Sequence, residues 1–202
     1  MELIEGLKES LAKTIRNYNG KGWSPATSTN YSFRQTDKSE EIYVSRSGVD
    51  KSSFTSSDFI QVDRNGNSTK LNPNSKPSAE TLIHCVIYDL FPKAKVILHS
   101  HSIYPVLVSK KMNEHVSFEG FEIQKGFAGQ VTHDSEVNIP IFENSQEMDF
   151  FVKALNLRKE ELIHSCFLIK QHGTYAWGEN LFEAKRHIET LEYLCQCKWL
   201  DK

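Results

Sequence analysis

Three histidines stand out because their types and spacing suit a metal ion. His99 and His101 lie two residues apart, at the end of an apolar run that is typical of a buried strand. Alternate residues of a strand point to the same face, so both imidazoles are expected on one side. His172 follows a second apolar run and precedes Gly173. Three histidines with an open position are a ligand set of catalytic zinc, but the spacing alone does not bring His172 to the pair.

Two acids are candidates for proton transfer beside such a metal. Glu80 follows Pro77-Ser78 at a predicted helix start, and Glu122 lies downstream of the histidine pair in the segment Glu-Ile-Gln-Lys-Gly. A metal that polarises a carbonyl needs a nearby carboxylate to move a proton. The plain alternative for each is a solvated acid at a helix end or in a loop.

The remaining histidines are better interpreted as ordinary side chains. His84 and His187 fall in predicted helices. His115, His133 and His164 lie in loop-like stretches, and His133 is the one candidate for a group that supports a metal ligand.

Small polar residues gather between positions 27 and 48, and they include Asn30, Ser47 and Gly48. Backbone N–H groups near glycine, with serine and asparagine side chains, can hold a phosphate without a basic cluster. Ser78, the predicted N-cap of a helix, adds further donors. Ordinary turns would have the same composition, so these residues alone leave both interpretations open.

The elements that must position these residues follow from hydrophobic periodicity and capping signals. Helices are predicted over 3–16, 81–90 and 181–195, and another from an Asn144/Glu147 capping box through Leu155. Strands are predicted over 29–33, 42–44, 59–62, 95–99, 137–142, 166–170 and 174–177. No internal repeat or linker divides the chain, so residues 1–202 are predicted to form a single α/β domain.

The composition excludes several classes of function. Lys plus Arg number 24 and Asp plus Glu 26, for a net charge of -2, so bulk binding of nucleic acid or of an acidic membrane is not expected. No apolar run approaches the roughly 20 residues of a membrane-spanning helix. The start of the chain lacks a signal-peptide pattern, and the four cysteines contain no Cys-x-x-Cys pair. We therefore expect a cytoplasmic protein with reduced thiols.

Five motifs occur in a definite order along the chain: Asn30-Tyr31-Ser32, Ser47-Gly48-Val49, Lys76-Pro77-Ser78-Ala79-Glu80-Thr81, His99-Ser100-His101-Ser102 and Gln171-His172-Gly173. In this order the chain resembles the class II aldolase/adducin family over nearly its whole length. Segments 121–126, 137–142 and 175–178 resemble the branch of that family that dehydrates a methylsulfanyl-substituted ribulose phosphate in methionine salvage.

The resemblance implies a three-layer α/β/α sandwich around a mixed, mainly antiparallel sheet. It implies a homotetramer with active sites at subunit borders, acting on a small sugar phosphate. It also implies that His99, His101 and His172 bind one Zn²⁺ per subunit.

The resemblance further implies the substrate contacts. Asn30, Ser47, Gly48 and Ser78 match positions that hold the substrate phosphate, and Ala79 stands where many family aldolases have a second serine. Glu80 matches the catalytic acid of the aldolases and would here contact the substrate. Glu122 matches the general acid/base of the dehydratase branch, and it is the catalytic residue that we favour.

Three interpretations of function remain distinct at this point. The first is a zinc-dependent lyase that dehydrates the methylsulfanyl-ribulose phosphate. The second is a sugar-phosphate aldolase or pentulose-phosphate epimerase of the same family. The third is a non-catalytic, adducin-like interaction module, which is expected to lack the metal histidines that this chain keeps.

Overall fold

The structure is a computed structural model that describes residues 2–36, 41–71, 73 and 75–201. Its helices are α1 (Glu2–Gly20), α2 (Thr81–Leu90), α3 (Ile103–Lys111), α4 (Met148–Leu157) and α5 (Leu181–Leu200). Its strands are β1 (Tyr31–Arg34), β2 (Ile42–Ser45), β3 (Phe59–Val62), β4 (Val96–Ser100), β5 (His115–Phe118), β6 (Val137–Phe142), β7 (Cys166–Ile169) and β8 (Gly173–Gly178).

The eight strands form one sheet in the order β3-β2-β1-β4-β8-β7-β6-β5. Neighbouring strands are antiparallel, except that β6 and β7 run parallel. The prediction of a mixed, mainly antiparallel sheet is confirmed. β4 lies inside the sheet between β1 and β8, so it is buried on both faces, as its contiguous apolar residues predict.

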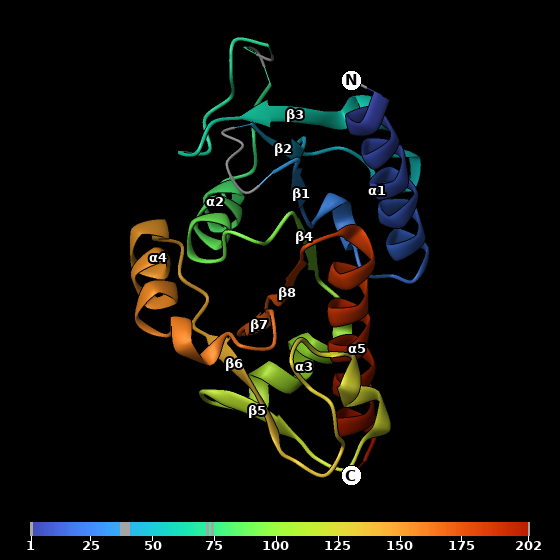
Figure 1. The fold of residues 1–202 in the computed structure, drawn as a ribbon, viewed down its shortest axis with the longest axis vertical. Coiled ribbons are helices and arrows are strands. Elements are labelled where there is room, and N and C mark those ends of the chain that lie inside the picture. The colour runs from blue at the N-terminus through green and yellow to red at the C-terminus, as the bar shows by residue number, and fades with distance from the viewer. Residues whose placement is uncertain (1, 37–40, 72, 74, 202) are drawn as a thin grey trace.

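Helices cover both faces of the sheet, and each face has its own apolar core (Figure 1). Helices α1, α3 and α5 lie over one face, and α2 and α4 over the other. Residues of β4 alternate between the cores: Leu98 packs on the α1–α5 face and Ile97 on the α2–α4 face. This alternation confirms the three-layer sandwich and decides which way each residue at the end of β4 points.

Several helix ends follow the local sequence signals. Helix α2 spans residues 81–90 as predicted, and the side chain of Asn180 accepts a hydrogen bond from the Glu183 N–H at the start of α5 (3.0 Å). Strand β6 also has its predicted bounds. These agreements arise where periodicity and a cap point to the same boundary.

Three local predictions were wrong. His115 begins the short strand β5 instead of lying in a loop. Helix α4 begins at Met148 without a side-chain cap, because Asn144 is turned towards His172. Ser78 is not the N-cap of α2; its hydroxyl accepts the Glu80 N–H in a turn that precedes the helix (3.3 Å).

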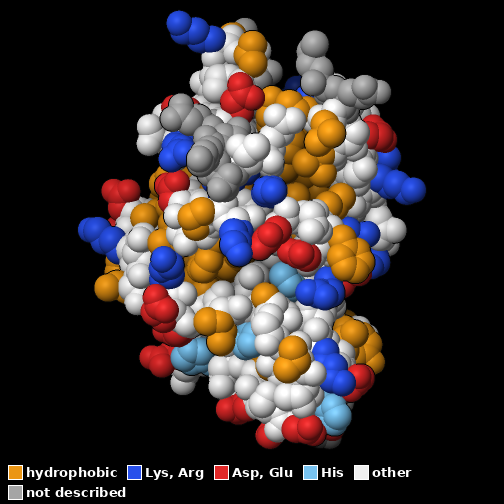
Figure 2. All heavy atoms as spheres, in the orientation of Figure 1, with side chains coloured by type: hydrophobic (Ala, Val, Ile, Leu, Met, Phe, Trp, Pro, Cys, Tyr) orange, Lys and Arg blue, Asp and Glu red, His pale blue; other side chains and the backbone are white. Residues whose placement is uncertain are grey.

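The surface agrees with the nearly neutral composition. Figure 2 shows acidic and basic side chains interspersed over one face of the molecule. Among the described residues, none of the helices combines the length and apolar character that crossing a bilayer requires.

Candidate active site

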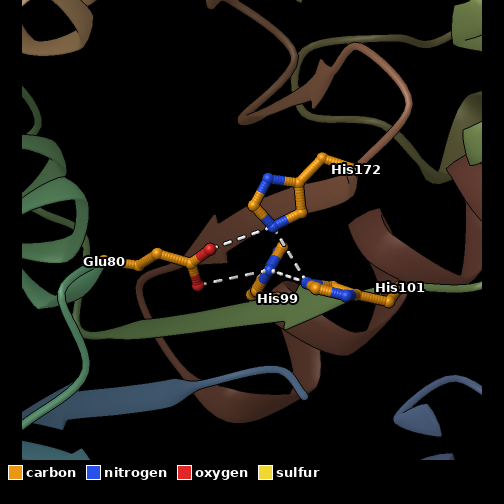
Figure 3. A group of neighbouring side chains, drawn as sticks. All are labelled: Glu80, His99, His101 and His172. Atoms are coloured by element: carbon orange, nitrogen blue, oxygen red, sulfur yellow. Dashed lines mark hydrogen bonds and ion pairs between the residues drawn. The ribbon is translucent and has the colours of Figure 1, made fainter. Parts of the chain in front are cut away.

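The three predicted histidines meet at one end of β4, together with Glu80 (Figure 3). The Nε2 atom of His101 lies 2.7 Å from Nε2 of His99 and 2.9 Å from Nε2 of His172. One Glu80 carboxylate oxygen lies 2.9 Å from His172 Nε2, and the other lies 3.6 Å from His99 Nε2. One donor atom from each of the four side chains therefore lies within 4.8 Å of every other.

The pairing of β4 with β8 explains why His172 reaches the pair. The strands are antiparallel and place Ser100 opposite Thr174, so the residue just before β8 lies beside the residue just after β4. Gly173 is required for this approach, because a Cβ atom there would lie 1.9 Å from the Ser100 carbonyl oxygen. The turn between β7 and β8 consequently places His172 next to His101.

The hydrogen bonds of the imidazoles suit a metal ion. His99 Nδ1–H donates to the Thr174 carbonyl (2.9 Å), and His172 Nδ1–H donates to the Asn144 side-chain oxygen (3.2 Å). Each donation leaves the Nε2 atom of that ring with a free lone pair. Lone pairs that converge with a carboxylate repel each other unless a cation lies between them. The donor set of three imidazoles and one carboxylate therefore fits a divalent metal.

Burial keeps two of the ligand histidines, His99 and His101, neutral. His99 is fully buried, and desolvation lowers its pKa well below the usual value. The same cause lowers the pKa of His101 to about 4. Protons therefore compete weakly with a metal for these nitrogens at neutral pH.

Glu80 is ionised and held from two sides. Burial raises its pKa, but the contact with His172 and the neighbouring His99 and His101 rings lower it by more, so the pKa lies well below its ordinary value. The Asn30 amide N–H donates to Glu80 Oε2, and the Tyr175 hydroxyl donates to the same oxygen (3.4 Å). A carboxylate in this position can bind the metal or accept a proton from a substrate beside it.

A buried chain of hydrogen bonds runs from Glu80 into the protein. The carboxylate only accepts, so the Asn30 amide group faces it and the Asn30 oxygen accepts from His84 Nε2–H. His84 Nδ1 therefore accepts from the Ser32 hydroxyl (2.7 Å), which in turn accepts from Tyr88 (2.8 Å). The direction of every bond in this chain follows from the charge of Glu80.

A cavity of about 310 Å³ opens beside the four side chains. Its polar wall contains the phosphate candidates Asn30, Ser47, Gly48 and Ser78 together with Glu80. The opposite wall comes from α4 and the segment before it. His101 and His172 line the same cavity, so a ligand there reaches both the metal position and the polar wall.

Glu122 lies elsewhere on the chain. It begins the 3₁₀ turn Glu122–Gly126, its side chain is 73% exposed, and it contacts Lys125 (2.7 Å) and His133 (3.1 Å). Phe121 and Phe127 on either side of this turn pack in the core on the α5 face, opposite the face of His99. Among the described residues that line the cavity of this chain, Glu122 is absent. His133 contacts Glu122 and Asp134, so the prediction that it supports a metal ligand was wrong.

Sequence reasoning missed two groups that orient the ligands. Asn144 was assigned to a helix cap, but its side chain holds His172. Thr174 holds His99 through its backbone carbonyl, which no side-chain pattern could reveal. The one sequence signal for the contact between Asn144 and His172 was the position of Asn144 just after β6, the strand that pairs with β7.

Comparison with known proteins places this arrangement in a family. Residues 9–199 match the Class II Aldolase and Adducin N-terminal domain. A methylthioribulose-1-phosphate dehydratase from Picosynechococcus sp. is 49% identical over 193 residues, which cover 95% of this chain and 90% of the relative. A methylthioribulose-1-phosphate dehydratase from Enterobacter sp. is 40% identical over 190 residues, which cover 93% of this chain and 91% of the relative.

Solved structures share the fold at lower sequence identity. An L-fuculose 1-phosphate aldolase superposes with a TM-score of 0.78 at 19% identity, over 97% of this chain and 86% of that one. The L-fuculose-1-phosphate aldolase from Thermus thermophilus gives a TM-score of 0.74 at 20% identity, over 98% and 94% of the two chains. With the family match and the relatives at 40–49% identity, the chain belongs to the class II aldolase and adducin family.

Proposed function

We propose that this protein is a zinc-dependent hydro-lyase of methionine salvage that works in the cytoplasm. Its substrate is 5-(methylsulfanyl)-D-ribulose 1-phosphate, and its product is 5-(methylsulfanyl)-2,3-dioxopentyl phosphate. The observation that carries the proposal is the convergence of His99, His101 and His172 beside a polar cavity, in a chain 49% identical to a methylthioribulose-1-phosphate dehydratase. A non-catalytic interaction module would have no need of this convergence.

The three histidines would hold the zinc, which supplies polarisation of the C2 carbonyl and so acidifies the C3 hydrogen. Asn144 and the Thr174 carbonyl keep His172 and His99 turned with Nε2 towards the metal position. Removal of the C3 proton and loss of the C4 hydroxyl as water leave an enol. The enol then takes a proton at C4 and becomes the 2,3-diketone.

Asn30, Ser47, Gly48 and Ser78 would bind the phosphate. They share one wall of the cavity, and Gly48 has a φ of +75°, which glycine adopts without strain. The Asn30 amide group donates to Glu80 and lines the cavity, where it would also donate to a phosphate oxygen. The wall holds hydroxyl and amide donors and no lysine or arginine, within the described part of the chain.

We propose that Glu122 is the acid/base and acts in the site of a neighbouring subunit of a homotetramer. Glu122 is exposed and lies on the α5 side of its own chain, so a second copy offers it a route to a cavity. Ile123 and Val131 near it are exposed apolar residues, which suits a subunit contact.

Mixed tetramers test this assignment. A His99→Ala chain lacks a ligand but carries Glu122, and a Glu122→Gln chain carries the ligands but lacks the carboxylate. If Glu122 acts across the border, tetramers reassembled from the two inactive variants regain part of the activity. If it acts within its own chain, both kinds of site stay inactive and the mixture shows no gain.

Aldol cleavage is the second candidate, because Glu80 lies at the metal position where the aldolases of the family place their catalytic acid. The same substrate separates the two functions. Dehydration yields a 2,3-diketone, which is trapped with an aromatic 1,2-diamine and identified by mass. Cleavage of the C3–C4 bond yields dihydroxyacetone phosphate and an aldehyde, and these products would overturn the proposed function.

A further inference from the structure

A buried carboxylate lies beneath the metal-ligand segment, on the side away from the metal. Glu192 of α5 is 4% exposed. Its Oε1 atom accepts a hydrogen bond from the Ser100 hydroxyl, and its Oε2 atom accepts one from the Ser102 hydroxyl. Both serines are buried. One side chain of α5 therefore binds two alternate residues of the segment His99-Ser100-His101-Ser102.

The alternation along this segment separates two functions. His99 and His101 point to the metal, and Ser100 and Ser102 point the other way to α5. The period of two along extended backbone places ligands on one face and anchors on the other. Glu192 thus contacts the serine next to each of the two ligands.

The backbone hydrogen bonds between strands do not hold His101 and Ser102, the second half of this segment. Strand β4 ends at Ser100, and the backbone N–H of His101 donates to the Trp23 carbonyl outside the sheet (2.9 Å). Ser102 occupies the N-cap position of α3, but its side chain makes no cap hydrogen bond. Its hydroxyl is committed to Glu192 instead, so the anchor replaces an ordinary helix cap.

The anchor is unfavourable as a simple structural contact. Burial raises the pKa of Glu192 to about 7. The charge of Lys21 acts on Glu192, but the ion pair of Lys21 is with Glu189. Apolar residues of similar size often replace such buried polar groups without loss of stability. A buried carboxylate at this position is therefore better explained by what its two hydrogen bonds position.

We propose that Glu192 is a positioning residue of the metal centre, which anchors Ser100 and Ser102 to α5 so that His99 and His101 meet at one point. The inference rests on the metal site of the proposed function, and it assigns Glu192 no contact with substrate. Loss of the anchor frees His101 first, because that ligand lies beyond the end of β4. The measurable consequence is lower metal affinity.

Zinc affinity of the full-length protein tests the proposal without substrate. The dissociation constant is measured by competition with a chromophoric chelator. Glu192→Leu should weaken zinc binding by about 10–100-fold, the range for groups that orient metal ligands. Glu192→Gln should stay within about threefold, because its amide oxygen accepts from one serine and its amide N–H donates to the other.

A matched control separates positioning from general destabilisation. Leu194→Ala removes a buried apolar side chain from the same helix and keeps both hydrogen bonds of Glu192, so its melting temperature should fall while its zinc affinity stays native. Cobalt(II) substituted for zinc reports the ligand geometry, and its visible spectrum should change in Glu192→Leu but not in Leu194→Ala. If Glu192→Leu fails to fold, the Ser100→Ala/Ser102→Ala double variant removes the same two hydrogen bonds and should show the same loss of affinity.

Native zinc affinity in Glu192→Leu, or in the double-serine variant, would overturn the proposal. An equal loss of affinity in Leu194→Ala would also overturn it, because the effect would then follow stability alone. The outcome is separate from the proposed function. A wild-type protein that binds zinc but forms no diketone would refute the dehydratase activity and leave the role of Glu192 standing.

Discussion

His84 should make the folded protein sensitive to mild acid. The ring is fully buried, and burial lowers its pKa from 6.5 to about 3, while Glu80 acts weakly in the opposite direction. In the unfolded chain His84 therefore binds a proton near pH 6.5, whereas in the folded chain it does not bind one until about pH 3. The contribution of His84 to the free energy of unfolding is fully present above pH 6.5. It is lost as the pH decreases from there, because only the unfolded state gains the proton.

The hydrogen-bond chain explains why the ring stays neutral. The oxygen of Asn30 must accept from His84 Nε2–H, and the Ser32 hydroxyl must donate to Nδ1, since the chain ends on the ionised Glu80. A second ring proton would turn Nδ1 into a donor, so the Ser32 hydroxyl could no longer donate to this nitrogen and would have to reverse its role. The free energy of unfolding changes by about 1.4 kcal/mol for each pH unit in which only the unfolded chain is protonated. Between pH 6.5 and pH 5 the loss assigned to His84 is therefore about 2 kcal/mol.

Urea unfolding of the metal-free protein at pH 7 and pH 5 measures this loss. The wild type should lose about 2 kcal/mol more than His84→Gln, which keeps a donor for Asn30 but has no ring to protonate. Tyr88→Phe is the matched control, because it shortens the same chain and leaves the imidazole in place, so it should keep the wild-type pH dependence. Equal losses in the wild type and His84→Gln would refute the reasoning.

Three further predictions concern the reaction. His99→Ala should lose most of the bound metal and nearly all activity while the far-UV circular dichroism stays native, and full metal occupancy by elemental analysis would contradict the ligand assignment. Asn30→Ala should lower kcat/KM, and the loss of transition-state stabilisation calculated from the ratio should be about 1.5–3 kcal/mol. A substrate without phosphate should be equally poor for the variant and the wild type. If the variant still prefers the phosphorylated substrate as strongly as the wild type does, Asn30 is not a phosphate contact. Glu122→Gln should lower kcat by about 10²–10⁴-fold with zinc retained, and exchange of the C3 hydrogen with deuterated solvent should be lost in Glu122→Gln but not in Glu80→Gln. The reverse result would assign the proton transfer to Glu80.

The sequence by itself determined most features that depend on a single element. The His-Ser-His-Ser alternation predicted that His99 and His101 share a face, and capping signals located the start of α5 at Asn180. These features are local, because a strand or a helix turn sets them over a few residues. The same logic failed at Asn144, where a contact with His172 outweighed a capping signal.

Only the tertiary structure decided which elements meet. His172 reaches the pair because β8 pairs with β4, and no periodicity within either strand encodes that order. Glu80 at the metal position, Glu122 on the other face and Glu192 beneath the serines are likewise matters of packing between distant segments. Periodicity reports which face of an element a residue occupies, whereas the distance between two faces depends on strand order and on the packing of the layers.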